Sequence, residues 1–239
     1  MVSVPGWFYG LDLFFDTFSV LAGLIIVILG AKIYYLTKEF RFRDLAVSFS
    51  FITAGFLIRI LGHIAAYYRS SVLQIISNSI PIITAEPGRP RAIYDAGTFL
   101  YTFFVLFGLS LLFLITINTL GRRRIFIPFF FILSLLVASF SLTRSYIFHL
   151  ISSLYLLYIS LAFYQNYKLK KTRSSFLVML SFLLFLISQV LFIFYRKDSI
   201  VWLLAESVYL LSFIILLFTL LIIILHKPKG VQNVRGKKN

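Results

Sequence analysis

The chain has 239 residues, of which 60% are hydrophobic and only 13% charged, and its mean hydropathy is +0.96. Soluble domains carry about 25% charged residues, so these values exclude an ordinary soluble domain and indicate an integral membrane protein. The chain contains no cysteine, which excludes disulfides, thiolate metal sites and cysteine nucleophiles.

Seven apolar runs follow one another along the chain, each close to the roughly 20 residues that an α-helix needs to cross a bilayer. We therefore predict an all-α, single-domain bundle of seven transmembrane helices. The fourth run is the shortest of the seven. The predicted spans are Leu13–Leu36, Leu45–Tyr67, Ile93–Thr119, Ile125–Leu142, Tyr146–Tyr167, Ser175–Tyr195 and Ile200–Leu225.

The segments outside the predicted spans are short. The amino terminus "MVSVPGWFYGLDLFFD" has acidic residues where a cleavable signal peptide is positively charged, so we expect the first span to remain in the mature protein. The longest loop, residues 68–92, could contain a short interfacial helix or a re-entrant segment. No appended soluble domain is expected.

Lys and Arg are unequally divided between the two sets of alternating loops. Sixteen of the 23 basic residues belong to one side of the predicted bundle and seven to the other. Basic loops stay in the cytoplasm, so this bias predicts a multi-pass cell-membrane protein with its amino terminus outside and its carboxyl terminus inside. The sixteen are Lys32, Lys38, Arg41, Arg43, Arg122, Arg123, Arg124, Lys168, Lys170, Lys171, Arg173, Lys227, Lys229, Arg235, Lys237 and Lys238.

The formal net charge of +15 follows mainly from this topology, so no nucleic-acid partner is needed to explain it. The basic tail, residues 226–239, and the loop "GRRR" are expected to contact anionic lipid headgroups at the cytoplasmic face.

Several polar residues interrupt the predicted spans in the outer half of the bundle. A helical rise of 1.5 Å per residue places Arg59, Glu206 and Gln189 at one depth, about 9 Å below the outer surface. Within about a turn of that surface lie His63, His149, Asp16 and Asp95. Together these seven residues form the predicted ligand-binding or ion-pair cluster.

Arg59 is the centre of this prediction. It shares a helical stripe with the small residues Ser48, Gly55 and Gly62, and small residues mark helix contacts in lipid. Arg59 should therefore face protein, with Glu206 as its counter-ion. Three interpretations remain open, namely an architectural ion pair, a ligand or ion site, and an arginine that extends outward to the membrane surface.

The sequence argues against several kinds of chemistry that membrane proteins perform. The seventh span has no lysine for a retinal Schiff base. Ser110 and His149 differ too much in depth to form a serine protease site, and Asp95 lacks a partner motif for a paired-aspartate protease. His63 and His149 could ligate one haem near the outer surface, which remains an alternative. We predict no catalytic residues, no metal site and no cofactor.

The stretch "KIYYLTKEFRFRDLAVSFSFITAGFLIRIL", residues 32–61, resembles the junction of the first two helices in small uncharacterised seven-helix membrane proteins of archaeal type. Their layout is similar to the seven-helix sensory modules of membrane histidine kinases. The resemblance implies a sensory or accessory role and carries over no functional residue.

These observations favour a non-enzymatic, receptor-like or accessory module that works with a protein partner, because short cytoplasmic loops can contact a partner but cannot catalyse. A small transporter or channel with an outer polar entry site is the alternative, and a structural subunit of a membrane complex is the third.

Overall fold

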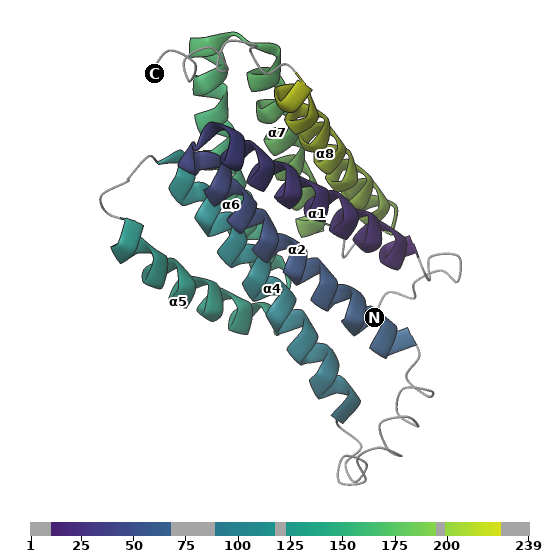
Figure 1. The fold of residues 1–239 in the computed structure, drawn as a ribbon. Helices are drawn as coiled ribbons and strands as arrows, with labels where there is room; N and C mark the ends of the chain where they lie inside the picture. Colours follow the sequence, from purple (N-terminus) through teal and green to yellow (C-terminus); the bar gives the residue numbers. More distant parts are fainter. Residues whose placement is uncertain (1–10, 68–88, 118–122, 195–198, 226–239) are drawn as a thin grey trace, which may run out of the picture.

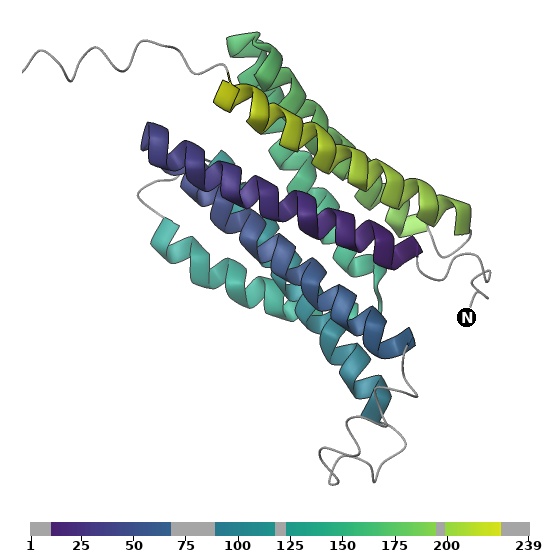
Figure 2. The ribbon, with the colours of Figure 1, turned by 45° about the vertical axis from the view of Figure 1, so that its right-hand side comes forward.

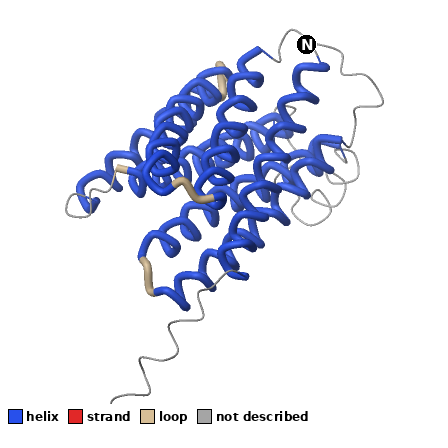
Figure 3. The backbone as a smooth tube through the Cα atoms, turned by 90° about the horizontal axis from the view of Figure 1, so that it is seen from above, coloured by secondary structure: helices blue, strands red, loops and turns tan. Residues whose placement is uncertain are grey.

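The structure is a computed structural model that describes residues 11–67, 89–117, 123–194 and 199–225. These residues are almost entirely helical, as Figure 3 makes plain. The described helices are α1 (Leu11–Thr37), α2 (Phe40–Tyr67), α4 (Arg89–Thr116), α5 (Arg123–Ser141), α6 (Tyr146–Lys170), α7 (Arg173–Phe194) and α8 (Ser199–Leu225). Each predicted span coincides with one of them.

The helix ends differ from the predicted span ends where polar residues continue a helix beyond its apolar part. The largest difference is in α2, which begins at Phe40 rather than at Leu45. Similarly, α4 begins at Arg89, so the last part of the predicted loop 68–92 is helical. The rest of that loop and the tail 226–239 lie outside the described residues.

Six of the described helices, α1, α2, α4, α6, α7 and α8, are long and apolar enough to cross a membrane. The apolar part of α5, Phe126–Ser141, is shorter. An all-helical chain with six such helices has the character of a multi-pass membrane protein.

The six long helices form a closed ring in the order α1, α2, α4, α6, α7, α8 and back to α1. In Figures 1 and 2, α1 lies beside α2, and α7 lies beside α8. Helix α6 is seen behind α1 and α2. Helix α5 lies outside this six-helix ring, against α4 and α6.

Helices α4 and α6 run in the same direction. Tyr101, near the middle of α4, and Phe148, near the start of α6, have ring centroids 5.6 Å apart, and Phe113 and Tyr155, each further along its own helix, are 5.5 Å apart. We use the name Leu11 end for the end of the bundle where α1, α4, α6 and α8 begin, and Leu225 end for the opposite one.

Glycine permits a close contact between α2 and α4. A Cβ on Gly108 would lie 2.6 Å from Cγ1 of Ile52 and 2.8 Å from the carbonyl oxygen of Ser48. A Cβ on Gly55 would lie 2.9 Å from Cγ2 of Val105. Ser48 and Gly55 of the small-residue stripe therefore do face α4.

Two tight turns at the Leu225 end join α1 to α2 and α6 to α7. Lys38 and Lys171 adopt positive φ values of 58° and 48°, and their N–H groups donate to the carbonyl oxygens of Tyr34 and Tyr167. This left-handed cap satisfies carbonyls that the ending helix would leave without a donor.

Candidate functional site

Arg59 on α2 lies between carboxylates from two other helices. Its Nη2 donates a hydrogen bond to Oε1 of Glu206 on α8 at 3.0 Å, and its Nη1 is 3.3 Å from Oδ1 of Asp16 on α1. Its guanidinium carbon also lies 5.3 Å from the centroid of the Tyr101 ring on α4. One side chain thus contacts three other helices.

The charged atoms of this site are withdrawn from the surface of the bundle. The side chains of Asp16 and Glu206 are 0% and 2% exposed, and that of Arg59 is 18% exposed. Charges in such surroundings persist when each is paired and hydrogen-bonded. The Glu206 pairing is the one expected from depth, and Asp16 adds a second counter-ion.

His63 extends the site by one turn toward the Leu11 end. Its Nδ1 lies 3.5 Å from Oδ2 of Asp16, and its side chain is 17% exposed. Because His63 follows Arg59 by four residues, both side chains project from one face of α2. We call Asp16, Arg59, His63 and Glu206 the charge cluster.

His149 and Gln189 form a second polar pair, on α6 and α7. A hydrogen bond of 2.9 Å joins Nδ1 of His149 to Oε1 of Gln189, and since this oxygen can only accept, Nδ1 carries the hydrogen. The His149 ring also stacks on Phe192 with centroids 5.0 Å apart. The polar residues of this half of the bundle are therefore divided between two groups.

Asp95 does not join either group in the part of the chain that the structure describes. Its side chain is exposed, near the Leu11 end of α4. Asp95 and Tyr101 are separated by about 120° around the helix axis, so the face of α4 that meets Arg59 does not carry Asp95.

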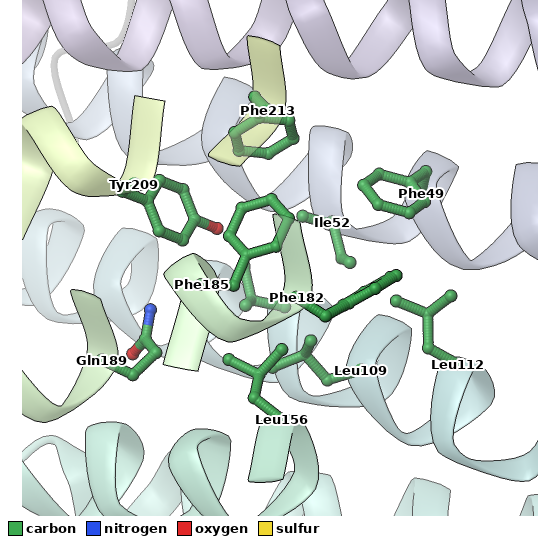
Figure 4. A pocket seen from close by; sticks show the side chains of 11 residues that line it. Phe49, Ile52, Leu109, Leu112, Leu156, Phe182, Phe185, Gln189, Tyr209 and Phe213 are labelled. Atoms are coloured by element: carbon green, nitrogen blue, oxygen red, sulfur yellow. The ribbon is translucent and has the colours of Figure 1, made fainter. Parts of the chain in front are cut away.

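On the Leu225 side of the charge cluster, a small, partly open cavity of about 20 Å³ lies among α2, α4, α6, α7 and α8. Figure 4 shows aromatic side chains of α2, α7 and α8 converging on it, with Tyr209 and Gln189 contributing polar atoms. A space of this size holds about one water molecule. The lining is Phe49, Ile52, Val105, Leu109, Leu112, Leu156, Phe182, Phe185, Gln189, Tyr209 and Phe213.

Aromatic contacts connect this cavity to the charge cluster. Phe56, one turn from Arg59, has its ring centroid 5.6 Å from those of Tyr101 and Tyr209. Tyr209 in turn follows Glu206 by about one turn of α8. Tyr101 was not among the site residues predicted from the sequence. Its depth in the membrane could have been calculated from the same helical rise per residue that aligned Arg59 with Glu206.

Within the described residues, no group of three or more His, Cys, Asp or Glu side chains is arranged to hold a metal ion. His63 and His149, the ligands of the haem alternative, contact Asp16 and Gln189 respectively.

The fold and the site together define a polytopic helical membrane protein with a buried charge cluster near one end of the bundle. No protein-family model, no curated protein and no solved structure matches the chain.

Proposed function

We propose that this chain is a non-enzymatic, receptor-like module of the cell membrane with seven spans, an outer amino terminus and a cytoplasmic carboxyl terminus. In this proposal the charge cluster responds to conditions at the outer face, and a protein partner reads the response at the cytoplasmic ends of the helices. Residues 32–61 resemble small uncharacterised seven-helix membrane proteins of archaeal type, and the similar layout of those proteins and seven-helix sensory modules agrees with this role.

The direction of the helices supports a seventh span. Since α4 and α6 run in the same direction, the chain has to return from the Leu225 end to the Leu11 end between them, and α5 is the connecting helix. With 19 residues, α5 is about 28 Å long, which approaches the thickness of the hydrocarbon core.

The charge bias supports the orientation. The tight turns with Lys38 and Lys171 lie at the Leu225 end, where α5 also begins, at Arg123. Basic segments near span ends stay in the cytoplasm, so the Leu11 end and the charge cluster face outward.

One observation carries the receptor-like role, namely that Arg59 binds carboxylates of two different helices. Helices α2 and α8 are not neighbours in the ring order, so the Arg59–Glu206 bond joins them across the interior. Any outer stimulus that alters one of these charges changes the force between α2 and both α1 and α8. Because long helices move as rigid elements, their cytoplasmic ends are displaced as well.

The test is a distance measurement between α1 and α8 at the Leu225 end. The chain has no cysteine, so Tyr35→Cys and Leu225→Cys, both at exposed positions, attach spin labels without background. We expect Glu206→Gln and Asp16→Asn to change the distance distribution of the protein in lipid nanodiscs, measured by pulsed electron paramagnetic resonance.

Ser207→Ala is the matched control, because Ser207 is exposed, adjacent to Glu206 and hydrogen-bonded only to Leu203 of its own helix among the bonds described. Its distance distribution should equal that of the unmodified background. Distances that stay constant in Glu206→Gln and Asp16→Asn while thermal stability falls would make the cluster purely architectural.

The transporter alternative has one observation in its favour, the small cavity among α2, α4, α6, α7 and α8. If the ring interior is a solute pathway closed by aromatic side chains, Phe185→Ala and Phe213→Ala should open it. Proton entry into liposomes containing a pH-sensitive dye measures this. The receptor proposal expects no increase over the unmodified protein.

Native mass spectrometry of the gently solubilised protein addresses the partner. The decisive result is a membrane protein that co-purifies with this chain at fixed stoichiometry. If that association persists when the charge cluster is mutated, this chain is better described as a structural subunit of a complex than as a receptor.

A further inference from the structure

The four side chains of the charge cluster carry unequal numbers of positive and negative charges when His63 is neutral. Asp16 and Glu206 contribute two negative charges and Arg59 one positive charge, which leaves a net charge of −1. A net charge among buried groups in the hydrocarbon region is unfavourable. One additional positive charge would balance the cluster.

His63 is placed to supply that charge. Its Nδ1 is 3.5 Å from Oδ2 of Asp16, so a proton on the imidazole creates an ion pair and brings the cluster to neutrality. Asp16 would then contact two cations, Arg59 through Oδ1 and His63 through Oδ2.

A proton fits this site better than a metal cation does. The guanidinium of Arg59 already lies 3.0 Å from Glu206 and 3.3 Å from Asp16, and so occupies the position between the carboxylates where a cation would bind. A proton needs no such space, since it binds directly to the ring nitrogen of His63.

The proton can reach His63 from the Leu11 end. His63 lies near the end of α2, which terminates at Tyr67, and its side chain is partly exposed, whereas the two carboxylates are almost fully covered. His63 therefore lies between the carboxylates and the surface of the bundle.

The helices packed around His63 provide few other titratable groups among the described side chains. These are Asp16 from α1, Arg59 from α2, Tyr101 and the exposed Asp95 from α4, and Glu206 and Tyr209 from α8. Of this set, histidine is the side chain whose ordinary charge change falls between about pH 5 and pH 8.

We propose that the charge cluster is a proton-binding site open to the outer face, with His63 as the residue that takes up the proton and Asp16 as its counter-ion. This inference rests on the proposed function and names its stimulus, which is acidification of the outer compartment. Proton uptake strengthens the attraction between α1 and α2, and release weakens it.

Trp202 provides the readout. Its ring centroid lies 6.3 Å from that of Phe15, next to Asp16, and it precedes Glu206 by about one turn of α8. With Trp7→Phe, Trp202 is the only tryptophan in the chain. The protein in lipid nanodiscs should show one shift of tryptophan emission between about pH 8 and pH 5.

Three variants identify the group responsible. His63→Asn should abolish the emission shift, and Asp16→Asn should remove it from this pH window, because its cluster is neutral without the proton. His149→Asn, the matched control in the second polar pair, should retain the shift. His63→Arg carries a permanent charge and should give the acid-form emission at every pH, which tests the idea even if His63→Asn folds poorly.

The proposal would be overturned if His63→Asn retained the emission shift with an unchanged pH midpoint. It would also be overturned if the emission shift disappeared in His149→Asn and not in His63→Asn. Absence of any shift in the Trp7→Phe background would also refute proton binding, yet leave the receptor role intact if Glu206→Gln still changes the distance between the labels on α1 and α8. Constant label distances in all variants would instead refute the receptor role itself.

Discussion

Arg59 of α2 and Glu206 of α8 are separated by 147 positions in the sequence, yet Nη2 of one donates to Oε1 of the other at 3.0 Å. The bond crosses the interior of the six-helix ring, and Asp16 of α1 shares the same guanidinium at 3.3 Å. A single cation therefore balances charge on two helices, which determines how mutations at this site should combine.

Replacing Arg59 by Leu should be the most damaging single change in the charge cluster. It leaves two carboxylates without their cation, and breaking a buried pair typically costs about 3–5 kcal/mol. Glu206→Leu should cost less, because Asp16 still balances Arg59. Thermal unfolding in detergent measures both effects.

The double variant Arg59→Leu with Glu206→Leu should recover only part of the lost stability, because Asp16 remains charged and loses its arginine. Adding Asp16→Leu should restore more. Strictly additive losses across the three positions would mean that these side chains do not interact.

Gly108→Ala should destabilise the contact between α2 and α4 by about 1–3 kcal/mol, because the new methyl group would overlap Ile52 and the backbone of Ser48. Gly62→Ala is the control, since a Cβ there meets no atom within 4 Å. Alanine is the better helix former by about 1 kcal/mol, so Gly62→Ala should be neutral or slightly stabilising. Denaturation midpoints that respond equally to both substitutions would contradict the close approach at Gly108.

Single cysteines test the seven-span topology, because the chain has none of its own. Thr143→Cys, between α5 and α6, should react with a membrane-impermeant thiol reagent added to intact cells. Lys171→Cys, between α6 and α7, should react only after the membrane is opened. If the amino terminus is outside and α5 does not cross the bilayer, the pattern reverses, with Thr143→Cys protected in intact cells and Lys171→Cys reactive.

Reporter fusions check the same topology at the ends of the chain. A reporter that folds only in the cytoplasm should be active after Asn239 and inactive before Met1. Activity at both ends would indicate an even number of spans, with α5 the helix that fails to cross.

Gln189→Leu should destabilise the protein by about 1–3 kcal/mol, because it removes the acceptor of the buried His149 hydrogen bond. His149→Phe keeps an aromatic ring against Phe192 but leaves Gln189 without its donor, so its loss should be similar. The double variant should be more stable than the sum of the two losses predicts. Thermal unfolding of the four proteins completes the cycle.

Much of the local structure follows from the sequence alone. Seven apolar runs of spanning length predicted the seven described helices, because a helix must satisfy its own backbone hydrogen bonds in lipid. The constant rise per residue aligned Arg59 with Glu206 in depth, and the small residues of α2 predicted the face that meets α4 at Gly55. All of these properties depend on a single helix and its position along the bilayer normal.

The lateral order of the helices and their rotation were decided only by the tertiary structure. Depth alone put Gln189 at the level of Arg59 and Glu206, whereas the tertiary structure pairs Gln189 with His149 on the neighbouring helix α6. Rotation of α1 turns Asp16 toward Arg59, while rotation of α4 leaves Asp95 exposed. Hydropathy cannot distinguish these arrangements, because lipid and a neighbouring helix are similarly apolar. The choice is made by side-chain packing and by charges that must find partners on other helices.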